Sequence, residues 1–327
     1  AVKRFPVLET AGIRKFFSGP ESFTPDTNTL LGEVPEIKNF FVCCGLNSIG
    51  IGSGGGVGKV TAEWLMTGHI NEDIFSYDIK RFQKFHSELG FIKERITESL
   101  GDLYGVHWPF KQHKTSRNIK KLPHHESLKS FGACFGVSGG YERPMWFALD
   151  GEKSEYEHSY NYQNWYPSAE YETNNTIKNV GLFDLTPFSK FEIFSEKAHE
   201  ELQKICTANI KDEIGKCTYT QMLNSDGGIE TDLTVVCLEK NHFRIISSAA
   251  TRERDKFHIK KHLSKEIQLK DVTDDYCVFG LFGPKSRELI KNLSDDNFEK
   301  DNFKFATAKY ISIEGIKIWA QRLSYVG

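Results

Sequence analysis

The residues with the clearest chemical potential form a glycine-rich stretch, NSIGIGSGGGVGK, which runs from Asn47 to Lys59. It follows a short apolar run with the length of a strand, NFFVCCG, and leads into VTAEWLMTGH, which has the spacing of a helix. Glycine-rich turns between a strand and a helix often hold phosphate, because free backbone N–H groups at a helix start attract anions. The stretch can therefore be compared with three kinds of site: an ATP loop, a dinucleotide fingerprint and the wall of a flavin site.

An ATP loop does not fit the residues of this stretch. Its pattern, G-x-x-x-x-G-K-[ST], ends in a hydroxyl that reaches magnesium. Gly58 and Lys59 fit the centre of the pattern, but Ser53 replaces its first glycine and Val60 replaces the hydroxyl residue. Because the magnesium ligand is missing, the sequence argues against ATP at this position.

Only the glycines of a dinucleotide fingerprint match this stretch. Gly50, Gly52 and Gly55 match G-x-G-x-x-G. That fingerprint normally lies tight against its strand, and an acidic residue follows about 20 positions later in a second strand. Here Asn47 and Ser48 intervene, and no second Val/Ile-rich strand follows the helix. The match is therefore expected to be accidental.

A flat cofactor offers a third interpretation of the same stretch. Glycines let the backbone approach a planar ligand closely. The start of the following helix carries partial positive charge, which would stabilise negative charge on a reduced isoalloxazine ring. Simple close packing of a strand against a helix is the alternative, and the stretch by itself leaves both open.

A second candidate site lies in TYTQMLNSDGGIETDLTVV. Asp226, Gly227 and Gly228 have the composition of a hairpin turn. Asp232 then falls inside an apolar strand, where a carboxylate either faces a pocket or is an ordinary exposed strand residue. Tyr219 lies on the preceding predicted strand, where a tyrosine can pack across the strands.

The histidines and cysteines form no recognisable metal site. Four histidines lie in the central part of the sequence: His107, His113, His124 and His125. Their spacing is irregular and no acidic or Cys partner falls in register, so no metal is expected. Cys43 and Cys44 are expected to face opposite sides of a buried strand as small hydrophobic residues. The seven cysteines form no CxxC pair, and an odd count without framework spacing indicates a reducing compartment.

The elements that must position these residues follow from the spacing of apolar residues. The pattern predicts a helix over 4–19, and a second helix over 57–66 that ends at Gly68. Residues 75–100 contain two amphipathic stretches, YDIKRFQKF and FIKERITESL. Residues 101–167 differ, because they are rich in aromatic, histidine and loop residues.

The pattern changes again from about residue 170. VGLFDLTPFSKFEIF alternates into a strand, and the following segment predicts a three-strand meander with turns at NSDGG and EKNH. TRERDKFHIKKHL predicts a helix, and DDYCVFGLFGPKSRELIKNL predicts a strand, a Gly-Pro turn and a helix. AKYISIEGIKIWAQRLSYV predicts a hairpin with Glu-Gly at its turn.

Length and composition bound the class of protein. A chain of 327 residues favours two domains, and 39% hydrophobic with 26% charged residues is a globular composition. The net charge of -2 argues against a nucleic-acid partner, and no apolar run is long enough for a membrane span. No signal peptide is visible. The start at Ala1 without methionine and the end beside a predicted strand lead us to expect a fragment, inactive by itself.

Several motifs together resemble one family. GPESFTPD, GEVPEIKNFFVCCGLNSIGI and GGGVGKVTAEW resemble the C-terminal part of the FAD-binding module of the dimethylglycine dehydrogenase and sarcosine dehydrogenase family, which belongs to the glycine-oxidase-like flavoproteins. YDIKRF, Arg117-Asn118 and GACFGVSGGYERPMWF resemble the central segment of that family. VGLFDLTPFSKFEI, YTQMLNSDGGIETDLTV and FGPKSRELI resemble the folate-binding region shared with the aminomethyltransferase of the glycine cleavage system.

The resemblance implies an α+β fold with three parts. Residues 1–100 would be the C-terminal portion of an FAD-dependent oxidoreductase domain, and residues 101–167 its central segment. Residues 168–327 would be the N-terminal portion of an aminomethyltransferase-like, antiparallel β-rich folate domain. The true Rossmann fingerprint of the family would precede this chain.

The resemblance also implies the chemistry. The activity is oxidative demethylation of an N-methylglycine, dimethylglycine or sarcosine, with FAD as the hydride acceptor and tetrahydrofolate as the acceptor of the one-carbon unit. Asp232 is the implied catalytic residue beside the folate nitrogens, Tyr219 lines the folate pocket, and Arg252 flanks it. The implied FAD-binding residues are Thr24, Pro25, Asp26, Asn47, Ser48, Gly50, Ile51 and Gly52. Asp26 could equally be a turn-forming aspartate.

Two further functions stay open at the sequence level. EVPEIKNFFV and YDIKRF also resemble the non-catalytic regulatory subunit of pyruvate dehydrogenase phosphatase, although a retained Asp232 favours an enzyme. A pure aminomethyltransferase is disfavoured by the flavin-like front section. The expected partners are a small N-methylated amine and either an electron-transfer partner or oxygen, with no nucleic acid or membrane. The expected compartment is the cytoplasm in a bacterium or the mitochondrial matrix in a eukaryote.

Overall fold

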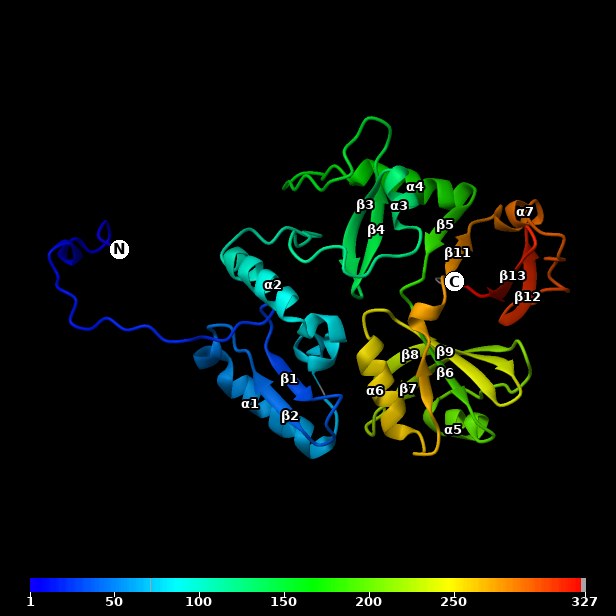
Figure 1. The fold of residues 1–327 in the computed structure, drawn as a ribbon, viewed down its shortest axis with the longest axis horizontal. Coiled ribbons are helices and arrows are strands. Elements are labelled where there is room, and N and C mark those ends of the chain that lie inside the picture. The colour runs from blue at the N-terminus through cyan, green and yellow to red at the C-terminus, as the bar shows by residue number, and fades with distance from the viewer. Residues whose placement is uncertain (71, 325–327) are drawn as a thin grey trace.

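The computed structural model describes residues 1–70 and 72–324. Within these residues the strands form five separate sheets, four with two strands and one with five (Figure 1). Every strand pair is antiparallel, and helices are distributed along the whole chain. The mixture confirms the predicted α+β class. No helix in the described part of the chain is long and apolar enough to cross a membrane.

The first part of the chain is a small sheet with a helix beside it. Its elements are β1 (Leu30–Glu33), β2 (Phe41–Cys44), α1 (Gly50–Thr67) and, after three short 3-10 turns, α2 (Leu89–Asp102). Trp64 is the buried residue of α1, and its ring lies edge-on to Phe41 with the centroids 6.0 Å apart. Gly32 makes room for it, because a Cβ there would lie 2.2 Å from the Trp64 ring. Gly68 caps α1 with a φ of 81°, which confirms the predicted helix end.

The start of α1 differs from the prediction. The helix begins at Gly50 rather than near Val57, so the glycines of the opening stretch lie inside the helix and not in a turn. The backbone N–H of Ser53 already donates to the Ile49 carbonyl at 2.9 Å, which starts the helical ladder. Glycine tolerates helical φ and ψ at an entropic cost, so the helix can run back through them to the loop.

The predicted helix over 4–19 is wrong. The structure has only a 3-10 turn over Pro6–Glu9, and the four apolar residues behind the prediction are all exposed. They are Val7, Leu8, Ile13 and Phe16. No described element covers their face, and a short helix without tertiary packing is marginal in water.

NFFVCCG forms the predicted strand, but the prediction that this strand is buried is wrong. Cys43 and Cys44 are both exposed in β2. The sheet has only two strands, and α1 contacts it through Trp64 near Phe41, so nothing in the described part of the chain covers its far end. Burial on both faces needs layers on both faces, and these are missing here.

The central part holds a hairpin and two helices. They are α3 (His125–Ser130), β3 (Ala133–Ser138), β4 (Tyr141–Phe147) and α4 (Tyr166–Lys178). Glu142 is buried and accepts from Arg117 Nε at 2.7 Å and from the Asn118 backbone at 2.7 Å. Burial alone would raise the pKa of Glu142, but these hydrogen bonds and the guanidinium charge bring it below its ordinary value. The motifs SRN and YERPMWF are thus joined by one ion pair.

The five-stranded sheet contains the main core. Its strand order is β10-β6-β9-β8-β7, and α5 (Ala198–Ile205) and α6 (Arg252–His262) pack on one face. The strands are β6 (Ser189–Phe194), β7 (Cys217–Leu223), β8 (Ile229–Glu239), β9 (His242–Ser247) and β10 (Leu269–Asp271). The consecutive pairing of β7, β8 and β9 confirms the predicted meander. The core is formed by Phe191, Ile193, Leu202, Met222, Leu233, Val235, Phe243, Ile245 and Ile259, among others.

In Figure 1 the remaining elements lie above that sheet and to its upper right. β5 (Gly181–Asp184) pairs with β11 (Phe279–Phe282), which is followed by α7 (Ser286–Lys291). β12 (Thr307–Ile313) and β13 (Ile316–Arg322) form the predicted hairpin, with Glu314 and Gly315 at its turn and both at positive φ. The predicted strand, turn and helix around the Gly-Pro pair are also confirmed.

Candidate functional site

Tyr219 and Asp232 form a hydrogen-bonded pair on the β7–β8 hairpin. The phenol oxygen of Tyr219 donates to Asp232 Oδ2 at 2.9 Å. The register places Gln221 directly opposite Asp232, so Tyr219 reaches the carboxylate diagonally across the two strands. The structure therefore brings together the two residues that the sequence assigned to one ligand.

Alternation along the strands sets the face on which this pair lies. Leu233 and Val235 point into the main core, whereas Asp232 and Tyr219 lie on the opposite face and are exposed. The hydrogen bond to Asp232 raises the pKa of Tyr219, so the phenol keeps its proton and stays a donor. An exposed carboxylate that is held through one oxygen can accept from a ligand N–H through the other.

Arg252 lies in a different cluster from this pair. Its guanidinium donates to Asp271 at 3.0 and 2.9 Å, and to the Tyr141 phenol at 3.2 Å. Asp274 also accepts from Arg252 and from Lys120, so the cluster joins the central hairpin to α6. Burial raises the pKa of Tyr141, and its hydrogen bond to Asp274 adds to that rise. Arg252 is therefore engaged between elements of the protein itself.

A hollow at the start of α1 collects half of the predicted FAD-binding residues. It has a volume of about 330 Å³, and its lining includes Asn47, Ser48, Gly50 and Ile51. The first backbone N–H groups of α1 have no partner within the helix, so they give this end partial positive charge. Such an end can stabilise an anion or a ring that gains negative charge.

The loop before this hollow is held by hydrogen bonds to Asn47. Asn47 is buried, and its Oδ1 accepts from the Thr24 backbone N–H at 2.8 Å. Asn47 and Ser48 both have positive φ, at 48° and 65°. These left-handed conformations are uncommon for residues with a Cβ and turn the chain sharply into α1. Thr24 does not line the hollow itself, but its backbone hydrogen-bonds to Asn47, which does. Gly52 lies exposed in the first turn of the helix.

Pro25 and Asp26 are tied to other elements. Arg81 binds Asp26 with two hydrogen bonds, from Nε at 2.6 Å and from Nη2 at 2.9 Å. Asp26 Oδ1 also accepts from the Asn28 backbone N–H at 3.2 Å, which is the geometry of an Asx turn. The Pro25 carbonyl accepts from Ser99 Oγ at 2.7 Å. Both residues make contacts that hold this loop.

Arg81 holds this loop in place through contacts that the sequence does not reveal. It is buried between Asp26 and the carbonyls of Asn28 and Thr29, to which it donates at 3.0 and 3.2 Å. Arg81 belongs to the motif YDIKRF, in which charged residues stand between aromatic ones. An arginine there is read as an exposed helix residue unless its partner, far back in the chain, is known.

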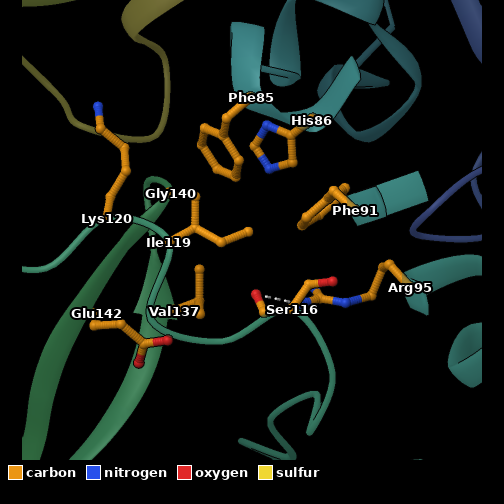
Figure 2. A pocket seen from close by; sticks show the side chains of 10 residues that line it. All are labelled: Phe85, His86, Phe91, Arg95, Ser116, Ile119, Lys120, Val137, Gly140 and Glu142. Atoms are coloured by element: carbon orange, nitrogen blue, oxygen red, sulfur yellow. Dashed lines mark hydrogen bonds between the residues drawn. The ribbon is translucent and has the colours of Figure 1, made fainter. Parts of the chain in front are cut away.

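Figure 2 shows a second, much smaller cavity between α2 and the β3–β4 hairpin. Its volume is about 20 Å³, which is room for about one water molecule and excludes a pterin or an isoalloxazine ring. His86 lines it, and burial lowers the pKa of His86 to about 4. This cavity is a packing space around a neutral histidine and does not add to either candidate site.

The histidines of the central part make separate contacts. His124 Nε2 lies 2.5 Å from Asp184, whereas the His125 ring packs against Phe135 with the centroids 4.0 Å apart. Over the ranges 1–70 and 72–324, no group of three or more His, Cys, Asp or Glu side chains is placed to hold a metal ion.

Two known protein families together match most of the chain. The family described as "GCVT N-terminal domain" matches residues 124–327, and the family described as "FAD dependent oxidoreductase central domain" matches residues 67–121. The two matches adjoin each other in the central part of the chain.

Three curated proteins are similar over almost the whole chain. A 4-methylaminobutanoate oxidase (formaldehyde-forming) of Paenarthrobacter nicotinovorans is 36% identical, and the match covers 98% of this chain and 39% of that protein. The mitochondrial sarcosine dehydrogenase of Homo sapiens is 32% identical over 100% of this chain and 40% of its own. The mitochondrial pyruvate dehydrogenase phosphatase regulatory subunit of Mus musculus is 31% identical over 97% of this chain and 37% of its own. The chain spans about two fifths of the length of these relatives.

Proposed function

The chain belongs to the family of the GCVT N-terminal domain, and on that premise we propose that it is part of an FAD-dependent enzyme that oxidatively demethylates an N-methylated amine. The proposed substrate is an N-methylglycine, dimethylglycine or sarcosine, and the proposed acceptor of the one-carbon unit is tetrahydrofolate. The observation that carries the proposal is the Tyr219–Asp232 pair, which lies open to solvent on the outer face of the main sheet. The names of the oxidase and dehydrogenase relatives support it.

The proposed division of the chain follows the two candidate sites. Residues 1–100 hold the flavin-side hollow, and residues 101–167 form a central segment of the oxidoreductase part. Residues 168–327 hold the folate-side pair. This division keeps β1, β2 and α1 in one unit and the five-stranded sheet in another.

The flavin-side residues fit a planar cofactor that gains negative charge. When bound, FAD supplies the acceptor for the hydride equivalent that leaves the N-methyl carbon. The chain's own contribution is positional: α1 begins with backbone N–H groups at Gly50, Ile51 and Gly52, which lie in the first turn and so have no partner within the helix. Asn47 holds the loop that forms the hollow, through the Thr24 backbone.

The folate-side residues fit a ligand that presents a nitrogen. Tyr219 holds one carboxylate oxygen of Asp232, which orients the other oxygen outward. Asp232 would then accept from a ligand N–H and take up or return a proton as the carbon–nitrogen bond forms. Tyr219 stays protonated because its hydrogen bond to Asp232 raises its pKa.

The substitution Asp232→Ala tests the folate side. In the full-length parent protein, this variant should release more free formaldehyde at an unchanged rate of amine oxidation, because the one-carbon unit is no longer captured efficiently. Formaldehyde trapping and a flavin reduction assay measure the two quantities. Glu239→Ala, an exposed acid at the end of the same strand, is the matched control. Unchanged partitioning in Asp232→Ala would count against the proposed role.

A non-catalytic regulatory protein is the second candidate, favoured by the similarity to the phosphatase regulatory subunit. The full-length parent distinguishes the two. An enzyme should purify with flavin absorbance and should reduce that flavin with dimethylglycine or sarcosine. A parent protein with no bound flavin and no turnover of either amine would remove the enzymatic proposal and leave the regulatory one.

A further inference from the structure

The end of α1 meets the turn of the β7–β8 hairpin, far away in the sequence. His69 directly follows the Gly68 cap, and its side chain is only 7% exposed. Its Nε2 lies 2.9 Å from Asp226 Oδ2, and its Nδ1 lies 3.3 Å from Ser225 Oγ. The Gly68 carbonyl accepts from Lys261 of α6 at 3.2 Å. A buried histidine therefore holds both side chains at the tip of the hairpin.

The turn that His69 contacts is internally braced. Asn224 Oδ1 accepts from the backbone N–H groups of Asp226 and Gly228, at 3.1 and 2.8 Å. Asn224 Nδ2 donates to Glu230 at 3.2 Å, and Glu230 is held from the other side by Arg254 at 2.8 Å. A displacement of the tip is thus transmitted into β8, because the turn has little freedom to absorb it. Asp232 follows Glu230 by two positions.

The residue types Ser225, His69 and Asp226 are those of a hydrolytic triad, but their placement is unsuited to one. Ser225 and Asp226 are neighbours on one tight turn, and the Asp226 side chain is 64% exposed. A triad aspartate is buried and orients its histidine in a site that excludes water. Neither hollow described above is lined by these three residues. The contact is better suited to holding two elements together.

We propose that His69 is a positioning residue that fixes the β7–β8 hairpin, and with it Tyr219 and Asp232, relative to α1. The inference rests on the proposed function, because it concerns transfer between the flavin side and the folate side. α1 has 18 residues, so its start at the hollow lies about 27 Å from its end at His69. One helix therefore leads from the hollow to the tip of the hairpin that carries Tyr219 and Asp232.

This placement predicts a specific defect when the contact is lost. A hairpin that moves relative to α1 presents Asp232 in varying positions to a one-carbon unit arriving from the flavin side. Capture by folate would fall while oxidation of the amine continues, because His69 is at the far end of the helix from the hollow. A residue of merely structural importance would lower both rates together.

The test uses His69→Ala, His69→Gln and Asp226→Ala in the full-length parent, with Lys261→Ala as the matched control at the same junction. Three quantities are measured: the rate of amine oxidation, the share of product released as free formaldehyde, and hydrogen exchange of the amides over 219–232. His69→Ala and Asp226→Ala should keep oxidation within twofold, raise the free formaldehyde share several-fold and speed exchange in the hairpin. His69→Gln, which keeps a donor, should restore part of the effect.

The possible results separate this inference from the proposed function. Unchanged exchange and unchanged partitioning in both alanine variants would overturn the positioning role, as would faster exchange without a change in partitioning. Loss of oxidation in parallel with capture would also overturn it. A wild-type parent that oxidises no amine would defeat the proposed function, and this inference would fall with it. In that case faster hairpin exchange in the alanine variants, with Lys261→Ala unchanged, would still establish the contact itself.

Discussion

Asp255 is a carboxyl group that the fold keeps away from water. It lies in α6 with no exposed surface, and the Thr251 hydroxyl donates to its Oδ2 at 2.7 Å. The hydroxyl groups of Ser247 and Thr231 also interact with this carboxyl group and offset part of the effect of burial. Burial raises the pKa of Asp255 to about 6. An ionised carboxylate at this place therefore costs folding free energy near neutral pH.

Asp255→Asn should stabilise the protein at neutral pH. In the folded state Asp255 binds its proton more tightly than in the unfolded chain, so its contribution to stability is lost as the pH rises from about 4 to about 6. A shift of about two pKa units corresponds to about 3 kcal/mol at most. Urea unfolding at pH 4 and pH 7.5 should show the gain for the amide variant at pH 7.5 and little gain at pH 4. An equal effect at both values would contradict the assignment.

The site residues differ in how far the sequence could predict their contacts. Period-two alternation suffices to place Tyr219 and Asp232 on one face of a hairpin, away from Leu233. Their hydrogen bond depends on the register, which a bulge between Met222 and Leu223 adjusts. Such irregularities leave no clear sequence signal, so the pair could be expected as neighbours but not as donor and acceptor.

At the scale of elements, α1 carries an unusual surface. A Cβ added at Gly54 or Gly56 would meet nothing within 4 Å, so the helix is open at both positions. Gly32, in contrast, has a φ of 108° and lies against the Trp64 ring. The same residue type thus serves two purposes: close packing in β1 and a bare helix surface in α1.

Alanine substitutions should separate these two roles. Gly54→Ala and Gly56→Ala should each stabilise this chain by about 0.5–1 kcal/mol, because alanine loses less backbone entropy in a helix. Gly32→Ala should destabilise it by about 1–3 kcal/mol, because the new Cβ overlaps Trp64 and the backbone conformation disfavours it. Chemical unfolding of the three variants measures both effects. A loss of stability in the two helix variants would mean that these positions are packed against something.

The limits of α1 show what local pattern can and cannot predict. The apolar spacing around Trp64 is sufficient to predict the helix, and the position of Gly68 is sufficient to predict its C-cap. The position of the glycine run between a strand and a helix indicates a turn. The helix nevertheless extends to Gly50, where Asn47 and Ser48 turn the chain sharply, and only those backbone conformations mark its true start.

For the molecule as a whole, the alternation of apolar and polar residues is sufficient to predict the α+β class and the meander. It does not predict how the strands divide into separate sheets. β5 and β11 pair although all five strands of the large sheet lie between them in the chain. No local pattern reports a partner at that separation. The predicted helix over 4–19 does not form for a related reason. A helical spacing of apolar residues predicts a helix only where another surface covers those residues.

The β5–β11 pairing also has a consequence for how this architecture can be rearranged. Leu182 lies opposite Leu281, so the chain enters and leaves the region between them at a single place. Everything from 185 to 278, including the hairpin with Asp232, is inserted between these two strands, and it also contacts α1 through His69 and the start of β12 through Ala308. A unit with adjacent ends can be inserted, exchanged or permuted without the flanking chain having to stretch. The β5–β11 pair is therefore the natural junction at which one such unit could be grafted in place of another.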